Sequence, residues 1–501
     1  MDVIDNLVYG FSIATQPLNL LFCFIGVLIG TLVGVLPGIG PVGAMSILLP
    51  MTFGISPVTG VIMLAGIYYG SMYGGSTTSI LVNIPGEAAS IVTCIDGYQM
   101  ALKGRAGVAL GISAFGSFIA GTLSLIGLVI MTNLLSGVAL LFGPVEYFSL
   151  MCLGISLVTY LTQGPMIKGF LMACVGIFLS QIGLDVATGQ ARFTFGLPGL
   201  IDGIGLVPLV MGLFGVSEVF LNLEKVGQRR EIIKTSFRQL FPGRDDWKRS
   251  WKPIGRGTII GFLLGILPGG GALISSFVSY AVEKKLSKTP ERFGKGAIEG
   301  VAGPESANNA ASSSGFIPLF ALGIPPNVIM ALLLGALMIH GVRPGPLLLS
   351  QNPEVFWGTV ASMYIGNVML LILNLPLIGI WVQVLRVPYK TLFPLILLFC
   401  VIGAYAISTN VFDVYLVLIF GILGYLLRKF HYEPAPLVLA FVLGPLLEKN
   451  LRQALILAEG DLSVFFTRPL SAICIGTALL VLGSSVVPSI RKRREEVVKE
   501  T

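Results

Sequence analysis

The chain has 501 residues, of which 54% are hydrophobic and only 11% are charged. Soluble proteins carry about 25% charged residues, so this composition excludes an ordinary soluble enzyme. The net charge of +7 comes from basic residues in short loops between apolar stretches, which is typical of cytoplasmic loops of membrane proteins. We therefore expect a lipid bilayer as the surroundings and no nucleic-acid partner.

Long apolar stretches predict helices that cross the membrane. Residues 108–161 contain a single acidic or basic side chain, Glu146. Because one crossing needs about 20 apolar residues, this stretch predicts two crossings. Continuous apolar runs favour helices over a barrel, whose strands alternate. The sequence thus predicts an all-α, polytopic helical membrane protein with about a dozen spans. Further crossings are predicted near residues 166–181, 199–221, 328–339, 357–385, 392–407, 411–427, 436–447 and 470–487.

Two stretches repeat each other, and each stops at a proline followed by glycines. Residues 26–40 and 257–271 are identical at nine of fifteen aligned positions. Each contains three glycines four residues apart, which predict a helix face packed closely on another helix. A helix does not continue through the residues that follow, Pro37–Gly40 (the first break) and Pro268–Gly271 (the second break). Two related halves with one broken apolar segment each are typical of secondary transporters.

Basic residues predict how the two halves lie in the membrane. Nine basic residues against four acidic ones lie between 222 and 253, and five basic residues lie between 284 and 295. The positive-inside rule places both of these segments in the cytoplasm. About ten apolar residues flank the second break on either side, so each arm reaches about 15 Å, half the hydrocarbon thickness.

This pattern predicts a re-entrant hairpin at the second break. The flanks of the first copy carry no basic residue, so its hairpin would open to the other side and form an inverted repeat. The predicted organisation is an N-terminal repeat at 1–222, a basic cytoplasmic linker at 223–253, a C-terminal repeat at 254–490 and a basic cytoplasmic tail at 491–501.

Candidate substrate-binding residues lie at the breaks and in two polar clusters within apolar surroundings. A helix that starts after a break offers free N–H groups to an anion, and glycine allows close approach. Hydroxyl and amide side chains supply donors to a carboxylate. We predict substrate contacts from Gly38, Gly40, Gly269, Gly270, Gly271, Ser76, Thr77, Thr78, Asn308, Asn309, Ser312 and Ser313. Alternatively, the glycines serve close packing and the polar residues serve hydrogen bonds between helices, worth about 0.6–2 kcal/mol each.

Acidic residues inside the membrane are costly and point to function. Glu305, within the second cluster, is the best candidate for handling a coupling ion, together with oxygens of Asn83 and Ser314. Glu87 and Glu146 are weaker candidates. The coupling ion is Na⁺ or H⁺, and no other metal and no cofactor are expected. Since no arginine lies in a polar cluster, we expect helix ends and hydroxyls to hold the substrate.

The sequence gives little support to a nucleotide-binding site or a zinc enzyme. The match of residues 38–43 to the dinucleotide pattern GxGxxG lacks the strand before it and the acid after it. The two histidines, His340 and His431, are far apart and form no zinc motif. We therefore predict that the protein is not an enzyme.

Several long motifs resemble one family. They are Gly74-Gly-Ser-Thr-Thr-Ser-Ile-Leu-Val-Asn-Ile-Pro-Gly-Glu87, Asp96-Gly-Tyr98, Lys103-Gly-Arg105-Ala-Gly107, Leu267-Pro-Gly-Gly-Gly-Ala272 and Gly303-Pro-Glu-Ser-Ala-Asn-Asn-Ala310. Together they resemble the large membrane subunit of the tripartite tricarboxylate transporters, the TctA family, over nearly the whole chain.

The resemblance implies a multi-pass permease of the bacterial inner membrane. Its implied partners are a small four-helix membrane subunit and a periplasmic solute-binding protein. The implied activity is uptake of citrate or another carboxylate driven by an ion gradient. The alternative is an anion channel, or a carboxylate permease that works without a binding protein.

Overall fold

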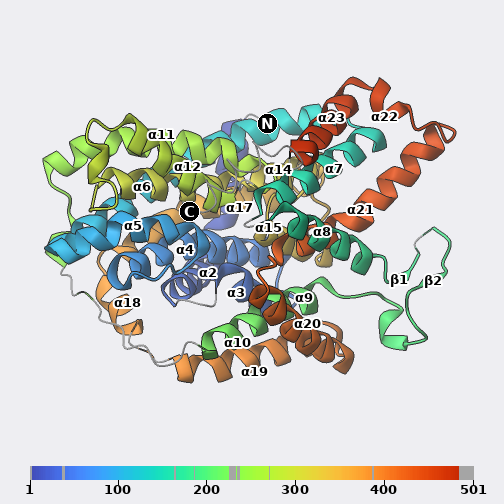
Figure 1. The fold of residues 1–501 in the computed structure, drawn as a ribbon, viewed down its shortest axis with the longest axis horizontal. Helices are drawn as coiled ribbons and strands as arrows, with labels where there is room; N and C mark the ends of the chain where they lie inside the picture. The colour runs from blue at the N-terminus through green and yellow to red at the C-terminus, as the bar shows by residue number, and fades with distance from the viewer. Residues whose placement is uncertain are drawn as a thin grey trace.

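The structure, a computed structural model, describes residues 3–36, 40–162, 165–185, 187–224, 233, 237–269, 271–385, 387 and 389–484, and most of them are helical (Figure 1). The helices before residue 225 are α1 (Val3–Ala14), α2 (Pro17–Val35), α3 (Gly40–Leu48), α4 (Pro57–Val82), α5 (Ile91–Met100), α6 (Ala106–Ala139), α7 (Pro144–Leu161), α8 (Met166–Ser180), α9 (Leu206–Val210) and α10 (Ser217–Glu224). Strands β1 (Gly183–Leu184) and β2 (Ala191–Arg192) pair antiparallel after α8.

The later helices are α11 (Arg244–Ile266), α12 (Gly271–Leu286), α13 (Glu299–Ser314), α14 (Phe316–Leu322), α15 (Val328–Ile339), α16 (Leu348–Gln351), α17 (Pro353–Asn374), α18 (Ile378–Val384), α19 (Tyr389–Ser408), α20 (Val411–Lys429), α21 (Ala435–Leu457), α22 (Val464–Thr467) and α23 (Pro469–Ser484). Short 3₁₀ or π turns connect or extend them: η1 (Leu49–Thr52), η2 (Ala88–Ser90), η3 (Ala101–Arg105), η4 (Pro198–Leu200), η5 (Met211–Val216), η6 (Phe237–Leu240) and η7 (Pro290–Arg292).

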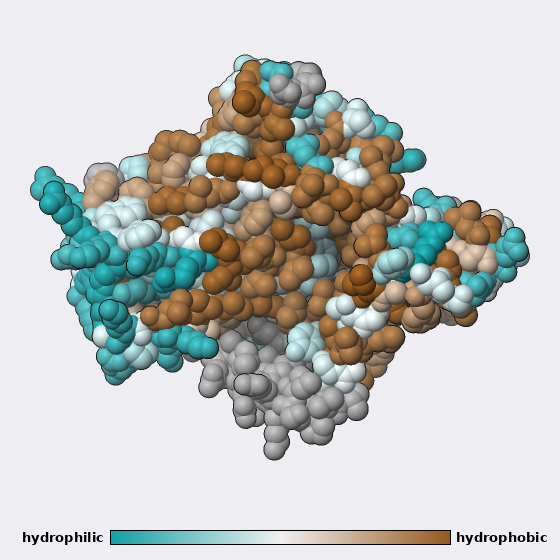
Figure 2. Space-filling model, turned by 90° about the horizontal axis from the view of Figure 1, so that it is seen from above, coloured by the Kyte–Doolittle hydropathy of each residue, from teal (hydrophilic) through white to brown (hydrophobic). Residues whose placement is uncertain are grey.

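The outer surface of the fold is suited to lipid. Figure 2 shows hydrophobic side chains across a broad middle zone, with hydrophilic ones gathered toward both ends. Within the described residues, six helical stretches are long and apolar enough to cross a bilayer: Pro17–Val35, Ala88–Ala139, Pro144–Leu161, Leu206–Glu224, Pro353–Asn374 and Val411–Lys429. The predicted class, an all-α polytopic membrane protein, is confirmed.

The helices before the two breaks are longer than the predicted arms. Helix α2 has 19 residues, and α11 has 23, or about 35 Å at 1.5 Å per residue. Helix α11 starts inside the predicted linker because the Asp246 carboxylate accepts the N–H of Gly243, 3.1 Å away, and caps the first turn. The Arg249 guanidinium then pairs with Glu299 at 2.8 Å. Helix α11 thus begins at Arg244, before the predicted apolar arm, and the re-entrant and inverted arrangement stays a prediction.

The regularly spaced glycines form close helix contacts, as predicted. Helix α2 packs along α4, and α11 packs along α13. A Cβ on Gly30 would lie closer than 3.0 Å to the Ile67 carbonyl oxygen, and one on Gly261 would meet the Ala307 carbonyl oxygen in the same way. The other four glycines also face backbone atoms of the partner helix: Gly26, Gly34, Gly257 and Gly265. The two halves thus repeat one packing arrangement as well as one sequence.

The correspondence continues past the packed helices. Helix α4 ends at Asn83 and α14 ends at Gly323, both in the left-handed conformation with φ of 56° and 69°. The residues that follow are Ile84-Pro-Gly-Glu87 in the first half and Ile324-Pro-Pro-Asn327 in the second. Each of these turns runs back toward a broken helix, and Glu87 and Asn327 occupy matching positions.

Candidate functional site

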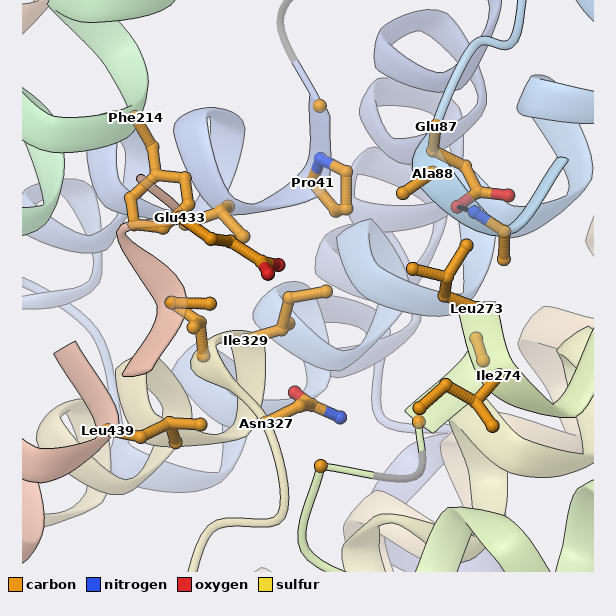
Figure 3. A pocket seen from close by; sticks show the side chains of 18 of the residues that line it. Pro41, Glu87, Ala88, Phe214, Leu273, Ile274, Asn327, Ile329, Glu433 and Leu439 are labelled. Carbon is orange, nitrogen blue, oxygen red and sulfur yellow. Dashed lines mark hydrogen bonds between the residues drawn. The ribbon is translucent and has the colours of Figure 1, made fainter. Parts of the chain in front are cut away.

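A cavity of about 490 Å³ lies between the two broken helices (Figure 3). The first break contributes Gly40, and the second contributes Gly269 and Gly271. Side chains from the turns after α4 and α14, from the end of α7 and from the α20–α21 connection complete the wall, among them Glu87, Asn327, Thr162 and Glu433. Figure 3 shows Glu87 and Glu433 on opposite sides of the cavity. Segments far apart in the sequence thus converge on one space.

Four helices begin at the wall of this cavity. They are α3, α12, α15 and α21, and their first residues Gly40, Gly271, Val328 and Ala435 all line it. The first N–H groups of a helix have no intrahelical partner and carry the positive end of its dipole. Several such ends around one space favour a negatively charged group.

The backbone at the breaks requires glycine. Gly40, Gly269 and Gly271 have φ of 63°, 77° and 43°, a region that disfavours residues with a Cβ. The N–H of Gly269 donates to the Pro326 carbonyl 2.9 Å away, which ties the second break to the turn before α15. These three predicted glycines line the cavity. The predicted contacts at Gly38 and Gly270 lie outside the described residues.

Glu305 lies in a buried hydrogen-bond network between the two halves. Its side chain is 1% exposed, and it accepts hydrogen bonds from the hydroxyls of Ser76, at 2.5 Å, and Thr93. Asn309, one turn further along α13, donates to the Ser117 hydroxyl at 2.7 Å. Glu305 is not among the residues that line the cavity. The Glu305 side chain thus links α4, α5 and α13, and its role as the coupling residue stays a prediction.

The remaining predicted residues lie inside the helix packing behind the cavity wall. The Thr78 hydroxyl donates to the Val35 carbonyl at 2.6 Å, at the end of α2. Ser312 and Ser313 donate to the Asn309 carbonyl, and Thr77 is buried in α4. Ser314 donates to the carbonyl of Ala311, and Asn83 caps the C-terminus of α4. The structure brings the two polar clusters together but leaves these side chains off the lining.

Of the acids considered from the sequence, Glu87 lines the cavity and Glu305 does not, although the sequence ranked Glu87 below Glu305. Glu87 is 7% exposed and caps the η2 turn, where its carboxylate accepts the N–H of Ala89 at 2.6 Å. Its other oxygen accepts from the Asn308 amide nitrogen, 3.3 Å away. A Cβ on Gly75 would lie 2.8 Å from Cγ of Glu87, so only glycine leaves room for this side chain.

Asn327 holds the matching position in the second half. Its side-chain oxygen accepts the N–H of Met330 at 2.9 Å and caps α15. Its amide nitrogen donates to the Tyr68 hydroxyl, 3.4 Å away on α4. The repeated Ile-Pro sequence just before Glu87 and Asn327 was the signal from which both residues could have been found.

An arginine also lines the cavity, contrary to the expectation from the sequence. Arg428, near the end of α20, pairs with Glu218, and its guanidinium lies 5.5 Å from the centre of the Phe214 ring. All three residues line the cavity. No local pattern marks Arg428, because only the packing of α20 against η5 and α10 brings it to the wall. The cavity wall thus contains a guanidinium that is already paired with a carboxylate.

Comparison with known proteins agrees with the resemblance. A model of the tripartite tricarboxylate transporter TctA family matches residues 20–439. Two similar proteins come from Agrobacterium vitis. The "Uncharacterized 52.8 kDa protein in TAR-I ttuC' 3'region" is 53% identical over 500 residues, covering 100% of this chain and 99% of the relative. The "Uncharacterized protein in TAR-II ttuC' 3'region" is 55% identical over 240 residues, covering 48% of this chain and 99% of the relative. No solved structure gives a significant match. With most of its length matched, the chain belongs to the tripartite tricarboxylate transporter TctA family.

Proposed function

We propose that this chain is the membrane subunit of a carboxylate importer driven by an ion gradient. The substrate is citrate or another tricarboxylate or dicarboxylate, delivered by a periplasmic binding protein. A small four-helix membrane subunit completes the transporter in the bacterial inner membrane, and the C-terminal tail is cytoplasmic. Membership of a tripartite transporter family supports this assignment.

The observation that carries the proposal is the shared cavity at the two breaks. Gly40, Gly269 and Gly271 line it from both halves, and four helices start on its wall. N–H groups at helix starts suit the oxygens of a carboxylate, and Asn327 already accepts one of them, the Met330 N–H of α15. A site between two repeated units also suits alternating access, in which the units rock around a fixed site.

Acidic side chains on the lining oppose the entry of an anionic substrate. The lining contains the carboxylates Glu87, Glu218 and Glu433 and the guanidinium of Arg428, which already pairs with Glu218. An anionic substrate that enters this space meets like charges as well as helix starts. A co-transported cation would remove part of that repulsion, which supports coupling to Na⁺ or H⁺.

Uptake by membrane vesicles tests the proposal. The vesicles contain this chain with its small subunit, and labelled citrate and other carboxylates are offered with or without the binding protein. We expect accumulation above equilibrium only when the binding protein is present and a Na⁺ or H⁺ gradient is imposed. Flux that only equilibrates the carboxylate, accompanied by ion currents, would instead show a channel.

A further inference from the structure

Glu87 has no ion-pair partner beside the cavity. Within the described residues, none of the ion pairs includes it. Its hydrogen bonds come from neutral groups, the Ala89 N–H and the Asn308 amide. A buried carboxylate is costly unless a cation balances it or a proton neutralises it. A cation or a proton bound at this point of the wall would therefore stabilise Glu87.

Asn308 lies behind the lining residue Glu87 and has an unused side-chain oxygen. Its side chain is 1% exposed, and its Nδ2 donates to Glu87. Its Oδ1 is buried and has no hydrogen-bond partner within the described part of the chain. Buried polar atoms are rarely left without a partner, and an amide oxygen next to a carboxylate is a suitable ligand pair for a hard cation.

The second half provides an internal comparison. Because Gly30 faces Ile67 and Gly261 faces Ala307, the next residues, Tyr68 and Asn308, occupy matching positions. The Asn327–Tyr68 contact is therefore the counterpart of the Glu87–Asn308 contact.

The two counterparts differ in charge. The side-chain oxygen of Asn327 accepts the N–H of Met330, and its nitrogen donates to Tyr68. The pair in the second half is therefore neutral, and both polar atoms of the Asn327 amide have hydrogen-bond partners. Only the first-half pair combines a carboxylate with an unused oxygen. The asymmetry predicts one cation site rather than two.

Glu305 lacks this combination. Its two carboxylate oxygens accept hydrogen bonds from Ser76 and Thr93, and it lies off the cavity lining. Both carboxylate oxygens of Glu87 also accept hydrogen bonds, so the two acids differ in position and in the unpartnered amide oxygen that Asn308 places beside Glu87. Glu87 has direct contact with the cavity, so a cation beside it acts on the substrate.

We propose that Glu87 and the Oδ1 of Asn308 bind one Na⁺ ion at the wall of the cavity, and that this ion is the one co-transported with the carboxylate. The assignment rests on the proposed function. The Na⁺ ion balances Glu87, and the substrate carboxylate then enters a space that has lost a negative charge. By reciprocity, Na⁺ raises the affinity for the carboxylate by the same factor by which the carboxylate raises the affinity for Na⁺.

Binding of ²²Na⁺ to the purified transporter, with its small subunit present, tests the site. We expect saturable binding of one Na⁺ per chain that choline does not displace. Glu87→Gln and Asn308→Ala should each weaken this binding at least tenfold. The matched controls are Glu354→Gln, in the first turn of α17 and off the cavity lining, and Asn133→Ala, whose amide donates to Val129 of its own helix. Both controls should bind Na⁺ as the wild type does.

Two results would overturn the assignment. One is unchanged ²²Na⁺ affinity in both site variants. The other is active carboxylate uptake by the wild type that responds to a H⁺ gradient and shows no ²²Na⁺ binding, which would leave Glu87 as a proton carrier and the Asn308 oxygen as a water site. Variants are compared only if they elute as monodisperse complexes with the wild-type melting temperature in Na⁺-free buffer. Failure of the proposed function gives a different result from these two, because the wild type would then accumulate no carboxylate under any ion gradient.

Discussion

Adding one methyl group at the second break separates backbone strain from steric overlap. Gly269 and Gly271 both have positive φ, so replacing either with alanine costs about 1–2 kcal/mol of conformational strain. A Cβ on Gly269 would also lie 2.9 Å from Cα of Val158 in α7, whereas a Cβ on Gly271 meets nothing within 4 Å. Overpacking against backbone adds about 1–3 kcal/mol. We therefore expect Gly269→Ala to lower the free energy of unfolding by about 2–5 kcal/mol and Gly271→Ala by about 1–2 kcal/mol.

Chemical unfolding of the purified chain in detergent micelles measures this difference. Both variants should insert in the membrane, and Gly269→Ala should unfold at the lower denaturant concentration. Carboxylate uptake should fall further in Gly269→Ala, because displacement of α7 moves part of the cavity wall. Equal losses of stability in the two variants would show that a Cβ at Gly269 does not overlap α7, since the steric contact exists at one position only.

Three further changes give independent tests. Gly261→Ala should lower the free energy of unfolding by about 1–3 kcal/mol, because the added Cβ overlaps α13. Gly255 has open space around it, so Gly255→Ala should leave the free energy of unfolding unchanged or raise it by up to about 1 kcal/mol. Similar denaturation curves for the two variants would contradict this difference. Arg428→Gln removes the guanidinium from the lining and should raise the KM of uptake about tenfold, or about 1.4 kcal/mol; an unchanged KM would remove Arg428 from the substrate space. The N–H of Ala187, with further contributions from two arginines, lowers the pKa of Asp185 to about 2. The pKa of Asp in an unfolded chain is about 3.9, so the loop before β2 should resist pepsin above about pH 4 and lose this resistance as the pH falls toward 2. The variant Asp185→Asn should be cleaved both above about pH 4 and near pH 2.

The sequence predicted the parts of the fold that depend on local spacing. Glycines four residues apart in α2 and α11 face the backbones of α4 and α13, and the two breaks fall between consecutive helices. These features follow from steric rules that act within a few turns of helix. The start of α11 was wrong because its first turns are polar, and a polar helix resembles a loop unless its cap at Asp246 is recognised.

Contacts between the halves could not be found in the same way. Glu87 meets Asn308, and Asn327 meets Tyr68, across more than two hundred residues of sequence. That packing brings Glu87 to the cavity and leaves Glu305 behind the wall, although Glu305 is the acid that lies within a polar cluster. The contribution of Arg428 likewise depends on α20 lying against η5.

The proposed function requires that the carboxylate binds between the two breaks. Electron cryomicroscopy of the complete transporter, with the carboxylate that gives the fastest uptake, tests it most directly. We expect density for the ligand within hydrogen-bonding distance of the first N–H groups of α3 and α12, close to Gly40 and Gly271. Ligand density elsewhere in the protein, with the space between these two helix starts empty, would contradict it.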